Sequence, residues 1–146
     1  MTSTLFRVTL IPIAVLLCFS FGDSNGEVVQ KTSLPNRTFW FAPNGKPNGD
    51  GSKEHPFRGS VPVFEAVCRK FGGGHTYMFK PGFYKGQLEI PKGCNGTKER
   101  PTILKSQVKW KAVVYGAKGW GLFSPCDWVI IDGFEVCTTL GTGITV

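Results

Sequence analysis

Short apolar segments recur along this chain at even spacing, with turn-forming residues between them. Segments of this length joined by Gly-, Pro- and Asn-containing turns are typical of β-strands. The predicted strands are residues 39–41, 76–79, 87–90, 102–105, 112–115, 121–123, 128–131, 134–136 and 143–146. The pattern therefore predicts an all-β fold.

One segment, residues 61–71, has helical instead of strand periodicity. Ser60 is a candidate N-cap, and Pro62 stands in the first turn, where its missing N–H costs nothing. Three glycines at 72–74 end the helix. In a stack of strands, such a helix can cap the first turn and cover its apolar interior. The apolar residues on one face are Phe64, Val67, Cys68 and Phe71.

A weak repeat runs through the predicted strands. Thr76, Thr102 and Trp128 each begin a strand, and each start follows the preceding one by 26 residues. A regular interval of this length suits a solenoid, in which each coil stacks on the preceding one. A small disulfide-linked β-sandwich spaces its strands similarly and remains the alternative.

The N-terminal residues have the pattern of a secretory signal. Arg7 precedes an apolar run of about a dozen residues, shorter than the ~20 that span a membrane. We expect residues 1–22 to be a signal peptide, although an uncleaved anchor is the alternative, and residues 23–38 to be a flexible leader. The mature chain would be secreted, with no membrane contact after cleavage.

The chain is basic, with a formal net charge of +7. Without residues 1–22, 16 Lys and Arg face 10 Asp and Glu, which leaves +6. This charge favours polyanionic partners, and for a secreted protein we expect an acidic polysaccharide. Scattered lysines on a solvated surface are the simpler explanation. Bases and aromatics do not interleave as in nucleic-acid motifs, so no nucleic-acid partner is predicted.

Five segments, in this order, resemble the N-terminal part of the pectate-lyase-like superfamily of secreted right-handed parallel β-helix proteins. They are residues 39–45, 50–57, 76–84, 96–103 and 128–135. The resemblance implies N-terminal coils of a β-helix with one capping helix over residues 39–146. It also implies a longer protein of the polysaccharide-lyase or glycosidase type, of which this chain is the first, truncated portion.

The resemblance assigns no catalytic residue to this chain, because no position matches the catalytic Lys/Arg or the calcium ligands of these enzymes. Asp132–Gly133 is explained by a turn. We therefore expect no cofactor and no catalytic activity for the chain alone, although Ca²⁺ is a candidate for a full-length relative. Four residues that could in principle ligate calcium, Asn44, Asn48, Asp50 and Glu54, are better explained by turn chemistry.

A non-catalytic module that binds glycans is the alternative function, and a disulfide-stapled structural protein is a third. The exposed residues that could contact a glycan are Trp110, Trp120, Lys109, Lys111 and Lys118. Packing of both tryptophans between coils is the simpler prediction for them. Two sequons, at Asn36 and Asn95, are candidate N-glycosylation sites.

Four cysteines remain after signal cleavage, and their spacing fits no zinc site. We expect Cys68, late in the helix, to bond to Cys94 in an early coil, which would tie the cap to the coils. Cys126 and Cys137 could face each other only if Asp132–Gly133 were a hairpin turn. We predict a bend there, so these two cysteines stay free or pair outside this chain.

Overall fold

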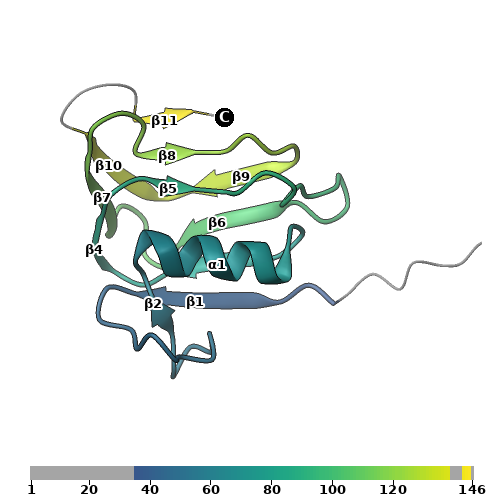
Figure 1. Cartoon of the computed structure of the whole chain (residues 1–146), viewed down its shortest axis with the longest axis horizontal. Coiled ribbons are helices and arrows are strands. Elements are labelled where there is room, and N and C mark those ends of the chain that lie inside the picture. Colours follow the sequence, from purple (N-terminus) through teal and green to yellow (C-terminus); the bar gives the residue numbers. More distant parts are fainter. Residues whose placement is uncertain (1–34, 139–142, 146) are drawn as a thin grey trace, which may run out of the picture. The chain divides into compact units, whose positions relative to one another are not determined.

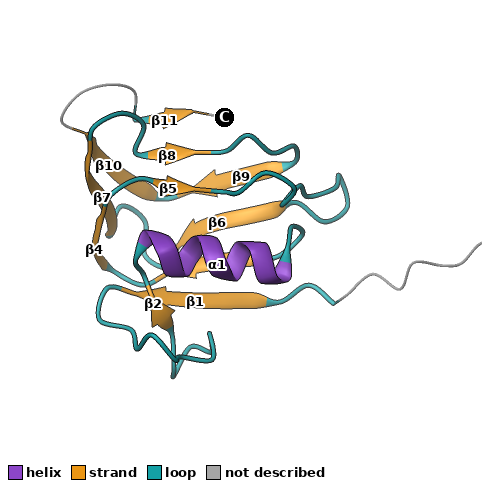
Figure 2. Ribbon diagram, in the orientation of Figure 1, coloured by secondary structure: helices purple, strands orange, loops and turns teal. Residues whose placement is uncertain are grey.

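Within residues 35–138 and 143–145, the chain folds into short strands and one helix, whose arrangement Figures 1 and 2 show. The structure is a computed structural model that describes residues 35–138 and 143–145. The predicted strand-rich class with one helix is confirmed. The strands are β1 (Thr38–Ala42), β2 (Phe57–Arg58), β3 (Thr76–Phe79), β4 (Gly82–Lys85), β5 (Leu88–Glu89), β6 (Thr102–Ser106), β7 (Ala112–Ala117), β8 (Leu122–Phe123), β9 (Val129–Asp132), β10 (Phe134–Thr138) and β11 (Ile144–Thr145).

The described strands form three sheets, and every strand pairing between them is parallel. The first sheet has the order β2-β1-β3-β6-β9, the second β10-β7-β4 and the third β11-β8-β5. From β3 onward, successive strands enter the first, second and third sheet in turn (Figure 1). A sandwich of antiparallel sheets, the alternative prediction, does not have this pairing.

The repeat in the first sheet is one residue longer than the sequence suggested. Thr76 pairs with Ile103 instead of Thr102, and Thr102 pairs with Val129 instead of Trp128. The predicted interval was wrong because strand starts do not mark the register: β6 begins at Thr102, one residue before the partner of Thr76, and β9 begins at Val129, after Trp128. In the second sheet the steps are uneven, since the step from Gly82 to its partner Ala112 is longer than the step from Ala112 to Phe134.

Helix α1 spans Val61–Phe71, as predicted. Its buried side chains are Phe64, Val67 and Cys68, which face the core. Ser60 has the extended backbone of an N-cap but makes no side-chain cap bond. Gly72, with a φ of 79°, ends the helix and donates its N–H to the Cys68 carbonyl at 2.7 Å. The helix contacts β5 and β2, which places it beside the first strand of the third sheet.

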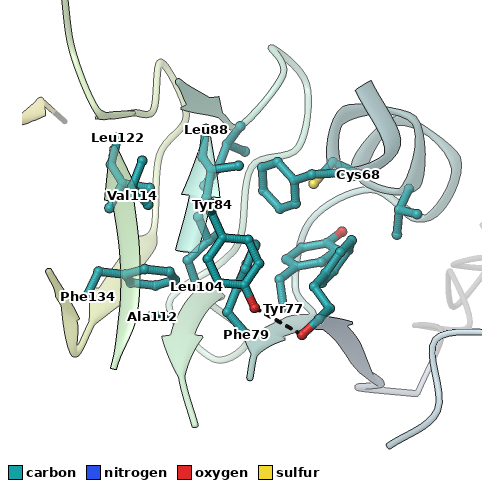
Figure 3. Close-up of a cluster of buried hydrophobic side chains, with 14 of the residues drawn as sticks. Cys68, Tyr77, Phe79, Tyr84, Leu88, Leu104, Ala112, Val114, Leu122 and Phe134 are labelled. Atoms are coloured by element: carbon teal, nitrogen blue, oxygen red, sulfur yellow. Dashed lines mark hydrogen bonds between the residues drawn. The ribbon is translucent and has the colours of Figure 1, made fainter. Parts of the chain in front are cut away.

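The three sheets and α1 share one hydrophobic core, part of which Figure 3 shows. Phe41 and Phe79 are register partners on neighbouring strands, and their ring centroids stack 5.0 Å apart. Phe79 also packs edge-on against Tyr84 and Phe134, each with ring centroids at 5.2 Å. The Tyr84 hydroxyl donates to the Lys80 carbonyl at 2.7 Å, so this buried polar atom has a partner.

Several sequence-based boundaries need correction. Residues 82–85 form β4 and residues 57–58 form β2, and neither strand was predicted. Thr38 belongs to β1, so the expected leader ends before it. The signal peptide and most of the leader lie outside the described residues. The Asp132–Gly133 bend is confirmed, because β9 and β10 belong to different sheets.

Candidate functional site

The strongest candidate site is a small polar cavity at the carboxyl ends of β6 and β9. Its volume is about 260 Å³, close to the lower end of ~300 Å³ for ligand pockets, so it suits a small polar group. Because β6 and β9 are parallel neighbours, residues that follow each strand meet at the same sheet edge. The cavity is lined by Lys105, Ser106, Gln107, Lys109, Asp132 and Gly133.

An ion pair crosses this sheet edge. Lys105 and Asp132 are register partners, and the Lys105 ammonium lies 2.8 Å from the Asp132 carboxylate. The hydrogen bond and charge of Lys105, with a smaller contribution from Lys109, hold the pKa of Asp132 below its ordinary value. Asp132 is therefore ionised at neutral pH and accepts hydrogen bonds without donating one. Both side chains are nearly half exposed, so a ligand can reach them.

The turn after β6 is fixed by its own hydrogen bonds. The Ser106 hydroxyl donates to the Val108 carbonyl at 2.6 Å and accepts from the Ala112 N–H at 3.2 Å. Trp110 then donates its N–H to the Gly133 carbonyl at 2.7 Å, which attaches the turn to the end of β9. The position of Trp110 beside the cavity is therefore set by the backbone.

The Trp110 side chain is exposed, although its backbone is unfavourable. Its φ is 64°, in the left-handed region that costs a residue with a Cβ roughly 1–2 kcal/mol. Its side chain is 57% exposed, so burial offsets little of this cost. The Lys109 ammonium lies 5.5 Å from the Trp110 ring centroid, in a cation–π arrangement. Trp128, with a φ of 55°, is the other non-glycine residue with positive φ in residues 35–138 and 143–145.

The five predicted glycan contacts do not form one surface. Lys109, Trp110 and Lys111 precede β7, whereas Lys118 and Trp120 follow it. The six residues of β7 extend roughly 20 Å, which separates the two groups. All five side chains are at least partly exposed, and Trp120 stacks on Phe123 with ring centroids at 4.9 Å. Of the five, Lys109 lines the cavity, and Trp110 is the next residue along the chain.

Sequence reasoning missed Lys105, Asp132 and Trp128. Asp132 was assigned to the turn alone, although its side chain pairs with Lys105. Aligning residues 102–105 with residues 129–132, as the strands pair, places Lys105 on Asp132. The correct repeat interval was the signal that could have found this pair.

A second, larger cavity of about 440 Å³ lies beside the loop that follows β1. Asn44, Asn48, Asp50 and Glu54, the residues considered for calcium, all line it. Asp50 accepts a hydrogen bond from the Ser52 N–H at 2.8 Å, and its bonds to Ser52 lower its pKa. This contact is an Asx turn, in a loop for which the sequence indicates turn chemistry. Residues 35–138 and 143–145 contain no group of three His, Cys, Asp or Glu placed to hold a metal ion.

The four cysteines within residues 35–138 are free thiols, but two of them, Cys68 and Cys94, lie close together. The Cys94 thiol donates to the Cys68 carbonyl at 3.3 Å, and both side chains are buried. Burial raises the pKa of both thiols. Cys126 contacts the Pro91 carbonyl at 3.2 Å, whereas Cys137 lies exposed on β10. The predicted Cys68–Cys94 bond therefore joins neighbours, and it stays a prediction.

Both candidate glycosylation sites are exposed. The Asn95 side-chain oxygen accepts from the Asp127 N–H at 3.1 Å, which leaves its amide nitrogen available for a sugar. Asn36 precedes β1.

Comparison of this chain with protein-family models, curated proteins and solved structures finds no match. Within the described residues, no helix has the length and apolar character needed to cross a membrane.

Proposed function

We propose that this chain forms the first coils of a right-handed parallel β-helix and binds acidic polysaccharide at the cavity between β6 and β9. The fold proposal is supported by the recurrence of strands through three parallel sheets, since parallel crossovers are right-handed in nearly all proteins. Helix α1 contacts β5 at the edge of the third sheet, the position expected of a capping element.

The observation that carries the binding proposal is the Lys109–Trp110 pair beside the Lys105–Asp132 cavity. An exposed indole ring offers a flat apolar surface to a pyranose ring. Lys109 supplies a positive charge for a uronate carboxylate. Asp132 accepts hydrogen bonds from sugar hydroxyls. The pyranose ring, the carboxylate and the hydroxyl groups of a uronate sugar therefore each have a partner at this site.

Binding without turnover fits the cavity better than catalysis does. Glycoside hydrolysis uses two carboxyl groups that flank the bond, and one of the two donates a proton. The lining residues include one carboxyl, Asp132, and its lowered pKa keeps it ionised. We therefore propose that the chain contributes ligand binding to a secreted, polysaccharide-directed protein, and that lyase or glycosidase chemistry belongs to longer relatives.

Calorimetric titration with polygalacturonate tests this proposal, with dextran as the uncharged control. We expect polygalacturonate to bind and Lys109→Gln to weaken it roughly two- to fivefold, the size of an exposed charge contact. Lys92→Gln, which removes an exposed lysine away from the cavity lining, should leave binding unchanged. Equal binding of dextran and polygalacturonate, or equal loss in both variants, would contradict a specific acidic-glycan site.

A further inference from the structure

Two exposed tryptophans lie at opposite ends of the β6–β9 strand pair. The Trp128 carbonyl accepts from the Thr102 N–H at 2.9 Å, at the start of both strands. Trp110 bonds to the Gly133 carbonyl at 2.7 Å, just beyond the end of β9. Gly133 follows Trp128 by five residues, so the backbone positions of the two tryptophans are separated by roughly 17 Å along the strands.

Both tryptophans combine a strained backbone with an exposed side chain. Their φ values are 64° and 55°, and their side chains are 57% and 55% exposed. Glycine would adopt the same backbone without strain and keep both main-chain hydrogen bonds. The fold therefore does not require an indole at either position, and strained residues of this kind concentrate at ligand sites.

The surface between the tryptophans changes from apolar to charged. Ile103 and Ile130 are register partners near Trp128, and Ile130 is 46% exposed. The next outward-facing row is Lys105 and Asp132, two residues further along each strand and closer to Trp110. A ligand that covers this surface would make apolar contacts near Trp128 and charged contacts near Trp110.

We propose that an acidic oligosaccharide lies along β6 and β9 and contacts Trp128 at one end and Trp110 at the other. This inference rests on the proposed function and extends its site from one tryptophan to two. The Lys109 ammonium attracts a uronate carboxylate, which commits the occupant to an acidic glycan. A short oligosaccharide occupies the Trp110 end alone, and a longer one gains the contact with Trp128.

The test is a calorimetric series of oligogalacturonides of increasing length, from the disaccharide upward. For the unmodified protein, affinity should rise with length until both tryptophans are reached and then level off. Trp128→Gly should leave the shortest ligands unchanged and reduce affinity for the longest about fivefold, the size of one aromatic contact. Trp110→Gly should weaken every length.

Phe83→Ala is the matched control, because Phe83 is a 69% exposed aromatic residue on β4, in a different sheet. It should change no affinity. Thermal melting of both glycine variants should show no loss of stability, which separates lost contact from unfolding.

The outcomes distinguish this inference from the proposed function. If oligosaccharides bind and Trp110→Gly weakens them, while Trp128→Gly changes no length or all lengths equally, the two-tryptophan site is overturned and the cavity site stands. If no acidic oligosaccharide binds the unmodified protein, both are overturned.

Discussion

The first region of the fold, residues 38–80, buries its aromatic side chains, whereas the second region, residues 102–136, exposes most of its own. In the first region, five aromatic side chains are at most 2% exposed: Phe39, Phe41, Phe64, Tyr77 and Phe79. In the second region, four are 39–57% exposed: Trp110, Tyr115, Trp120 and Trp128. The same residue class therefore stabilises the first region and remains available for contact in the second.

The backbone conformation of the aromatic residues also differs between the two regions. The aromatic residues of the first region stand in strands and a helix, where they stack with their register partners. Two tryptophans of the second region stand in left-handed turns. Burial offsets the conformational cost of a large side chain in the first case and does little to offset it in the second. This contrast is what the following predictions test.

Replacing a buried aromatic residue of the first region should have the largest effect. Phe79→Ala should lower the free energy of unfolding by about 3–5 kcal/mol, because it leaves a cavity among the rings of Phe41, Phe64 and Tyr84. Urea denaturation monitored by fluorescence measures the change. Phe83→Ala, at a 69% exposed position, should change the free energy by less than about 0.5 kcal/mol. Equal losses would contradict the assignment of the core.

Oxidation should stabilise the attachment of α1, an element of the first region, by a smaller amount. A Cys68–Cys94 disulfide closes a loop of 26 residues and ties α1 to the turn after β5, which is worth about 3 kcal/mol by chain entropy. Folding in a glutathione redox buffer followed by peptide mapping should find this bond. Cys94→Ser should abolish the stability gain that oxidation produces. A dominant Cys126–Cys137 bond instead would contradict the bend at Asp132–Gly133, which places β9 and β10 in different sheets.

Glycine substitutions should distinguish the strained tryptophans from other exposed ones. Trp110→Gly and Trp128→Gly should each stabilise the protein by about 0.5 kcal/mol, because relief of left-handed strain exceeds the added chain entropy. Trp120→Gly is the control: its φ is not positive, and it loses the stacking on Phe123. It should destabilise by about 1 kcal/mol. Loss of stability in all three variants would show that the indoles support the fold.

The first region was also easier to predict from sequence than the second. Helix α1 was predicted within its observed bounds, because the Ser60–Pro62 start and the glycines at 72–74 are local signals. The Lys105–Asp132 pair was not found, because it depends on the long-range register between β6 and β9, which no local pattern gives. The β4 strand was missed because the Pro–Gly dipeptide at residues 81 and 82 is typical of a turn, whereas Gly82 begins the strand.

The ion pair of the second region should have the smallest effect on stability, because both of its side chains are nearly half exposed to solvent. The pKa of Asp132 in the folded protein lies below its ordinary value of 3.8. Its contribution is therefore fully present above about pH 4 and is lost as the pH falls through the lowered pKa. Asp132→Asn should remove this contribution, so the melting temperatures of variant and unmodified protein should differ at neutral pH and converge toward about pH 2.

Asp127→Asn changes an exposed aspartate that forms no ion pair within the described chain, and it controls for the loss of one negative charge. If the difference in melting temperature instead grew on acidification, Asp132 would be held in its protonated form in the folded protein, which contradicts the prediction.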